Sequence, residues 1–109
     1  MFNQGEIVLI PVPFTDLSAT KRRPVLIISN DNYNAHSQDI IVVAITSNLT
    51  QTGIPITNSD MVNGQLPKPS LVRGDKVYTL SQSIVVKSIG SVSKAIRERV
   101  KIEINRLIA

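Results

Sequence analysis

Short runs of β-branched and aliphatic residues recur along the chain, and turn-forming residues separate them. This pattern is typical of strands joined by turns. The runs at 24–29 and 40–45 are apolar at nearly every position, which predicts strands covered on both faces. The run at 53–57 contains Pro55 and fits a sheet edge, because proline donates no ladder hydrogen bond. The expected strands cover residues 6–12, 24–29, 40–47, 53–57, 69–74, 76–82 and 84–92.

The period changes near the end of the chain, where a helix is expected from Ser93 onward. Ser93 is a suitable N-cap. Ile102 lies opposite the apolar stripe, so it is either an exposed residue without a role or a contact to a partner chain. The stripe consists of Ile96, Val100, Ile104, Leu107 and Ile108.

Strands followed by one terminal helix predict a mainly β (α+β) fold, namely a small curled sheet or open barrel capped by a helix. The length of 109 residues and the composition of 42% apolar and 18% charged residues suit one globular domain over residues 1–109. No internal repeat, low-complexity segment or linker divides the sequence.

The net charge of +4 favours a polyanion or an acidic protein as partner. The chain has no cysteine and one histidine, His36, which excludes disulfides, thiolate nucleophiles, cysteine-based zinc sites and multi-histidine metal sites. The apolar runs are far shorter than the roughly 20 residues of a membrane span. The first ten residues do not resemble a signal peptide, so a soluble, cytoplasmic protein is expected.

Positive charge is concentrated in the segment "KRRPVLIISN" at 21–30, directly before an apolar strand. Arg23 precedes Pro24, which favours an extended backbone and gives the arginine side chain a defined direction. Its planar fork of donors matches a phosphate. The alternative is a solvated basic loop, or an arginine paired with a nearby carboxylate such as Asp16.

Polar residues end the third expected strand in the segment "AITSN" at 44–48. The hydroxyls of Thr46 and Ser47 and the amide of Asn48 are able to bind phosphate oxygens at a strand end. The same residue types also cap turns, which is the alternative interpretation of this segment.

Three segments, "RPVLIIS", "AITS" and "KPSLVRGDKVYTL", occur in this order before the terminal helix. Together they resemble the MazF/PemK toxins of bacterial toxin–antitoxin pairs over nearly the whole chain. The resemblance implies an SH3-like barrel, a homodimer and a cofactor-free endoribonuclease that cuts single-stranded RNA without a metal. It also implies products with a 2′,3′-cyclic phosphate and a 5′-hydroxyl, and silencing by an acidic MazE/PemI-like antitoxin. The catalytic positions of the family correspond to Arg23 and Thr46.

Further positions are expected to bind RNA around this pair. Phe14 stacks on a base or packs beneath its loop, and Lys68 and Arg73 add charge to the groove. Two segments depart from the family pattern, "TDLSATKR" before Arg23 and "DKVYT", where Tyr78 replaces an arginine. These departures leave the recognised RNA sequence open. The other expected RNA-binding residues are Lys21, Arg22, Ser47, Asn48 and Lys76.

Two other functions suit the same fold. A CcdB-like protein poisons gyrase without being an enzyme, but the "RP" and "AIT" segments favour the nuclease. A plain SH3-like binding module usually has an aromatic-lined groove, and this chain has no tryptophan and two tyrosines. His36 has the intrinsic pKa of a general base, although it falls in a polar loop away from the positions that the family uses.

Overall fold

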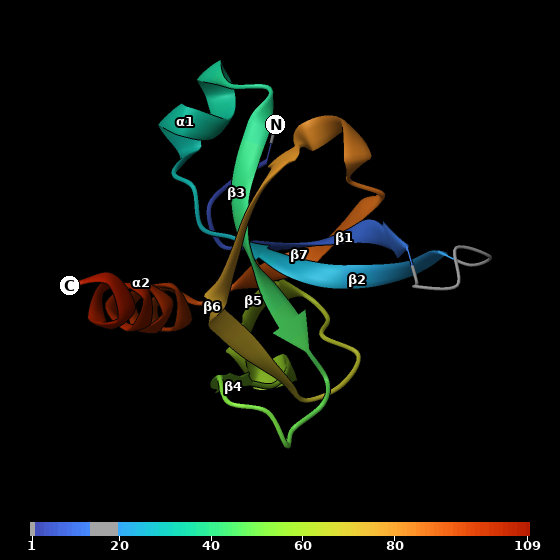
Figure 1. Cartoon of the computed structure of the whole chain (residues 1–109). Helices are drawn as coiled ribbons and strands as arrows, with labels where there is room; N and C mark the ends of the chain where they lie inside the picture. Colours follow the sequence, from blue (N-terminus) through green and yellow to red (C-terminus); the bar gives the residue numbers. More distant parts are fainter. Residues whose placement is uncertain (1, 14–19) are drawn as a thin grey trace.

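The computed structural model describes residues 2–13 and 20–109, and a curled antiparallel sheet of seven strands forms its centre (Figure 1). The strand order is β4-β6-β3-β2-β1-β7-β5. The strands are β1 (Glu6–Pro13), β2 (Thr20–Ile27), β3 (Asp39–Thr46), β4 (Ile54–Ile56), β5 (Met61–Gly64), β6 (Ser70–Ser81) and β7 (Lys87–Val92). The helices are α1 (Asp31–His36) and α2 (Lys94–Ile108), with 3-10 turns η1 (Asn58–Asp60) and η2 (Gln82–Ile84).

Two apolar cores lie on opposite faces of β1, β2 and β3, because the sheet curls back on itself. Neighbouring residues of β2 alternate between them: Leu26 packs into the first core, and Val25 and Ile27 pack into the second. In β3, Val43 belongs to the first core and Val42 to the second, and both are fully buried. The prediction that these two strands are covered on both faces is therefore confirmed.

The expected strands 69–74 and 76–82 form one continuous strand, β6, which corrects the sequence prediction. The register with β3 shifts between Val43 and Ala44, which face Val77 and Arg73 respectively. The extra residues of β6 form an irregularity around Gly74. The strand β4 lies at the sheet edge, as Pro55 predicts.

The segment expected to be a polar loop contains the short helix α1 instead. The Asn30 side chain caps it by accepting a hydrogen bond from the Tyr33 backbone N–H at 2.7 Å. Asn34 is buried and accepts a hydrogen bond from the Ser29 hydroxyl at 2.5 Å, which ties α1 to the sheet. His36 ends the helix in an exposed position, and its Nδ1 donates to the Asn32 carbonyl at 2.8 Å.

The terminal helix α2 begins after Ser93, whose hydroxyl accepts a hydrogen bond from the Ile96 N–H at 3.3 Å, as expected of the N-cap. The apolar stripe is buried at Ile96 and Val100 and half-buried at Ile104, whereas Leu107 and Ile108 are 45% and 76% exposed. The helix runs past the sheet, so its last turn has no core to cover (Figure 1). Within the described part of the chain, no helix has the length and apolar character needed to span a bilayer.

Candidate functional site

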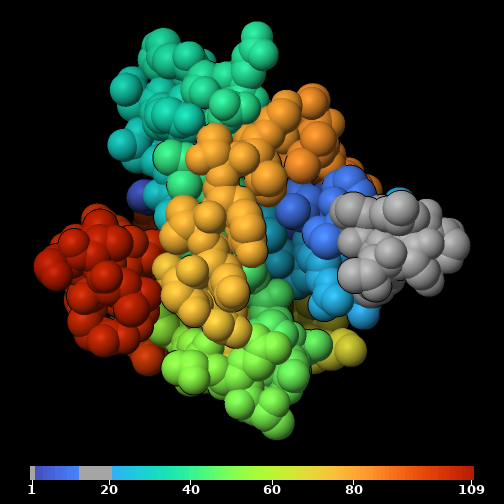
Figure 2. Space-filling model, in the orientation of Figure 1, coloured from blue at the N-terminus to red at the C-terminus, as the bar shows by residue number. Residues whose placement is uncertain are grey.

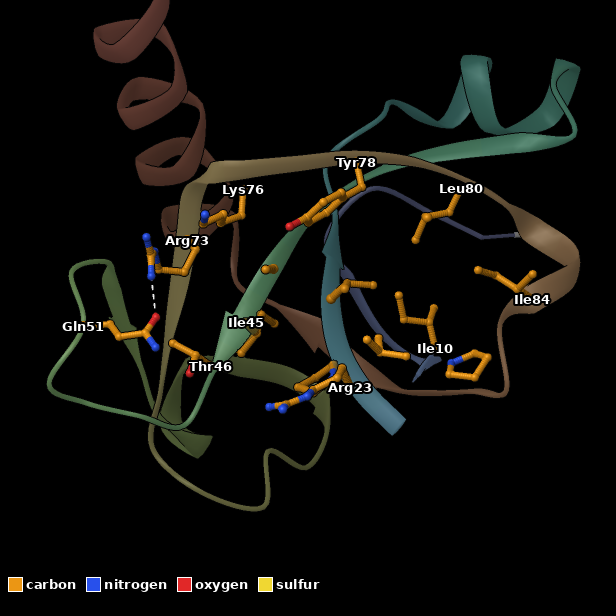
Figure 3. Close-up of a pocket in the computed structure, with 15 residues that line it drawn as sticks. Ile10, Arg23, Ile45, Thr46, Gln51, Arg73, Lys76, Tyr78, Leu80 and Ile84 are labelled. Atoms are coloured by element: carbon orange, nitrogen blue, oxygen red, sulfur yellow. Dashed lines mark hydrogen bonds between the residues drawn. The ribbon is translucent and has the colours of Figure 1, made fainter. Parts of the chain in front are cut away.

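A cavity of about 480 Å³ opens where β1, β2, β3 and β6 face one another. Figure 2 shows this side of the molecule hollowed between β6 and the β1–β2 pair. Apolar side chains, including Ile10 and Leu80 of the second core and the more exposed Ile84, form one end of the cavity, and polar side chains form the other (Figure 3). The polar lining consists of Arg23, Thr46, Gln51, Arg73, Lys76 and Tyr78.

Arg23 lies on β2, so the basic segment is a paired strand and not the loop that the sequence suggested. It faces Ile10 of β1 in the register of the two strands, and its side chain is exposed. Among the described residues it takes part in no ion pair. Asp16, the carboxylate considered as its partner, lies outside the described residues. The pairing of β2 with β1 fixes the backbone from which the guanidinium extends.

Thr46 ends β3 and shares the cavity with Arg23 (Figure 3). Its Oγ1 accepts a hydrogen bond from the Asn48 backbone N–H at 3.1 Å, which leaves the hydroxyl hydrogen available to a ligand. Asn48 lines no cavity with Thr46, and its side-chain oxygen accepts from the Thr50 N–H at 3.1 Å and hydroxyl at 2.6 Å. Asn48 therefore caps the turn, as the alternative interpretation of this segment had it. Thr46 both accepts a hydrogen bond within the turn and lines the cavity.

Arg73 is held in place at the polar end of the cavity. Its Nε and Nη2 donate to the two carboxylate oxygens of Asp75 at 3.0 and 2.8 Å, and its Nη1 donates to Oε1 of Gln51. The hydrogen bonds from Arg73 lower the pKa of Asp75, and the same carboxylate raises the pKa of Arg73. Gln51 was missed from the sequence, because an amide in the polar segment after β3 carries no pattern that marks it.

A second cavity of about 200 Å³ adjoins the first, and Arg23 lines both. Three of the expected RNA-binding residues, Lys21, Arg22 and Ser47, line this second cavity together with Lys68. Lys76 and Arg73, which the sequence also placed in the groove, line the first cavity. Phe14 lies outside the described residues, and His36 lines neither cavity.

A guanidinium and an alcohol therefore share one cavity, and three further cations line the next. Several donors and positive charges spaced along connected hollows suit a chain of phosphates better than a single small anion. The fold and the site are those of a small curled-sheet protein whose adjoining cavities are lined by positive charges, as expected of a protein that binds a polyanion.

The profile of the PemK-like, MazF-like toxins of type II toxin–antitoxin systems matches residues 3–108. The chain belongs to this family. It is similar to endoribonuclease MazF2 of Mycobacterium bovis, with 30% identity over 90 residues that cover 81% of this chain and 79% of the relative. Endoribonuclease MazF6 of Mycobacterium tuberculosis matches with the same identity and coverage.

Solved structures share the fold at lower identity. A mycobacterial endoribonuclease in complex with its cognate antitoxin superposes with a TM-score of 0.77 at 18% identity, covering 99% of this chain and 95% of that chain. MazF in the MazE–MazF complex of Deinococcus radiodurans gives a TM-score of 0.77 at 16% identity, covering 98% and 95%. These likenesses confirm the expected curled barrel with a C-terminal helix, and the family does not favour the CcdB-like alternative.

Proposed function

We propose that this chain is a sequence-specific endoribonuclease toxin that cleaves single-stranded RNA without a metal and so inhibits translation and growth. Its membership of the MazF-like family and its similarity to proteins named endoribonucleases support the activity. The observation that carries the site assignment is that Arg23 and Thr46, from different strands, line one cavity.

The proposed reaction uses the nucleophile that RNA already carries. The 2′-oxygen attacks the adjacent phosphorus, and the bond from phosphorus to the 5′-oxygen of the next nucleotide breaks. The 2′-hydroxyl loses its proton and the departing 5′-oxygen gains one, which leaves a 2′,3′-cyclic phosphate and a 5′-hydroxyl. The protein needs to align these atoms and to stabilise the negative charge that builds up on the phosphorane.

Arg23 and Thr46 have the chemistry for that stabilisation. The guanidinium of Arg23 stays protonated and offers a fork of donors to the non-bridging oxygens. The hydroxyl of Thr46 donates a further hydrogen bond to the same phosphate. Lys21, Arg22 and Lys68, which line the second cavity, bind neighbouring phosphates and set the position of the strand.

The proposed partner is an acidic MazE/PemI-like antitoxin that occupies the RNA-binding cavities. Two of the structurally similar toxins are described in complex with an antitoxin. The net charge of +4 suits an acidic partner as well as RNA. We further propose that the protein acts in the cytoplasm as a homodimer, as the family resemblance implies.

One experiment tests the activity and its chemistry together. The purified protein is incubated with defined single-stranded RNAs in EDTA, and the fragment ends are analysed. Fragments with 5′-hydroxyl and 2′,3′-cyclic phosphate ends are expected. If no RNA is cut and gyrase is inhibited instead, the CcdB-like function replaces the nuclease.

Lys76→Gln is expected to weaken RNA binding and to make it less salt-dependent, because Lys76 lines the first cavity. Loss of one phosphate contact to a single strand lowers the slope of log affinity against log salt by about 0.7. Fluorescence anisotropy with an uncleavable 2′-deoxy-substituted RNA measures this slope over a salt series. Lys94→Gln removes an exposed lysine outside both cavities and is the matched control. Equal slopes for the two variants would exclude Lys76 from phosphate binding.

A further inference from the structure

Side chains at the polar end of the first cavity are joined by hydrogen bonds that phosphate binding does not require. Gln51 and Arg73 line the cavity, and Asp75 holds Arg73 from outside it. We propose that Gln51 and Arg73 form a base-reading subsite that selects guanine over adenine beside the cleaved phosphate. This inference rests on the proposed nuclease function and adds a specificity-determining role at the same site.

The guanidinium plane of Arg73 is fixed by Asp75. Both carboxylate oxygens of Asp75 accept from it, at 3.0 and 2.8 Å, and its side chain is 18% exposed. A bidentate pair of this kind fixes orientation as well as position. The neighbouring negative charge also offsets the positive charge of Arg73, which makes it less suited to a phosphate than the exposed Arg23.

The hydrogen bond between Arg73 and Gln51 has a defined direction, which fixes how the Gln51 amide is turned. An arginine side chain only donates, so the atom of Gln51 that meets Arg73 is its carbonyl oxygen. The amide nitrogen of Gln51 is therefore turned away from Arg73 with two hydrogens to donate (Figure 3). Arg73 has five N–H groups, and its bonds to Asp75 and Gln51 use three of them. This corner of the cavity therefore presents mainly donors, because the one side-chain acceptor, the Gln51 oxygen, already accepts from Arg73.

The donors of Gln51 and Arg73 match one edge of guanine. The N7 and O6 atoms of guanine are two adjacent acceptors, whereas adenine replaces the second acceptor with an amino group that donates. Donors from Gln51 and Arg73 therefore match guanine and oppose the adenine amino group. Tyr78 lines the same cavity and is 48% exposed, so its ring is accessible for stacking on that base. In Figure 3 its ring lies between the Gln51–Arg73 end and the apolar end of the cavity.

The decisive variant is Gln51→Glu, because it keeps the shape and still accepts from Arg73, but replaces the donating nitrogen with an acceptor. Wild-type protein and variant cut a randomised single-stranded RNA, and the fragments with 5′-hydroxyl ends are sequenced. We expect guanine at one position near the cut for the wild type. The variant should lower the guanine-to-adenine preference at that position by roughly 10- to 100-fold. Preferences at the other positions should stay unchanged.

Gln38→Glu is the matched control, because it makes the same change of charge at an exposed glutamine outside both cavities. Equal base preferences in the wild type and Gln51→Glu would overturn the inference, as would a wild type without a guanine position. If Gln51→Glu cuts nothing, Gln51→Ala decides: loss of the guanine preference supports the subsite, and an unchanged preference overturns it. Absence of cutting by the wild type would instead overturn the nuclease function, and the inference with it.

Discussion

Arg23→Ala is expected to lower the rate of RNA cleavage by about 10²- to 10³-fold, which is the effect of removing one preorganised donor to a developing oxyanion. The side chain is exposed and contributes to neither apolar core, so the variant should fold normally. Single-turnover cleavage of a defined RNA measures the loss, and thermal unfolding checks the fold. Binding of an uncleavable RNA should fall much less than the rate, because the arginine acts mainly on the transition state.

Arg23→Lys is the matched control for this prediction. It keeps the positive charge but removes the planar fork, so it should recover only part of the lost rate. Full activity of the lysine variant would mean that charge alone matters at this position. A folded Arg23→Ala variant that cuts at the wild-type rate would remove Arg23 from the reaction.

Thr46→Val is expected to lower the cleavage rate by about 10- to 100-fold, because a hydrogen bond to a charged group typically contributes about 1.5–3 kcal/mol. Valine keeps the shape of the side chain and removes only the hydroxyl. The Asn48 N–H loses its acceptor, but it lies in an exposed turn where water replaces the bond. The free energy of unfolding should therefore fall by less than about 1 kcal/mol.

Thr46→Ser separates the hydroxyl from the methyl group and should keep most of the cleavage rate. A loss in the serine variant without a loss in the valine variant would indicate that packing of the methyl group, and not the hydroxyl, is what Thr46 supplies. His36→Ala tests whether a histidine acts as the general base of the reaction. His36 is the sole histidine of the chain and lies outside both cavities, so the variant should cut RNA at the wild-type rate. Loss of cleavage in a folded His36→Ala variant would contradict the roles given to Arg23 and Thr46.

The sequence predicted the strands and the terminal helix where a repeating apolar pattern marked them. The run at 40–45 and the stripe through Ile96 and Val100 are buried as expected, because period and burial agree there. It missed α1, which is short and polar and is held by contacts such as that of Asn34 with Ser29, and β5, which has only four residues, Met61–Gly64. Such short elements form because the surrounding fold provides partners for them, and their own sequences carry no repeating apolar pattern that would predict them.

The site was only partly visible in the sequence. Arg23 and Thr46 were selected through a family resemblance, since a basic segment and a polar strand end are individually unspecific. The contact between Gln51 and Arg73 joins residues 22 positions apart, one in the segment between β3 and β4 and the other on β6, and the pairing of β6 with β3 and β4 brings them together. The basic segment was misjudged as a loop because its polar residues conceal the pairing of β2 with β1.

Arg23 forms part of the wall between the two cavities, and this position affects how the protein can be inhibited. A ligand that covers this one side chain would contact both hollows at once. A short acidic peptide, or a small molecule with a carboxylate placed at Arg23, is therefore expected to compete with RNA for the first and the second cavity together, even where it fills neither of them.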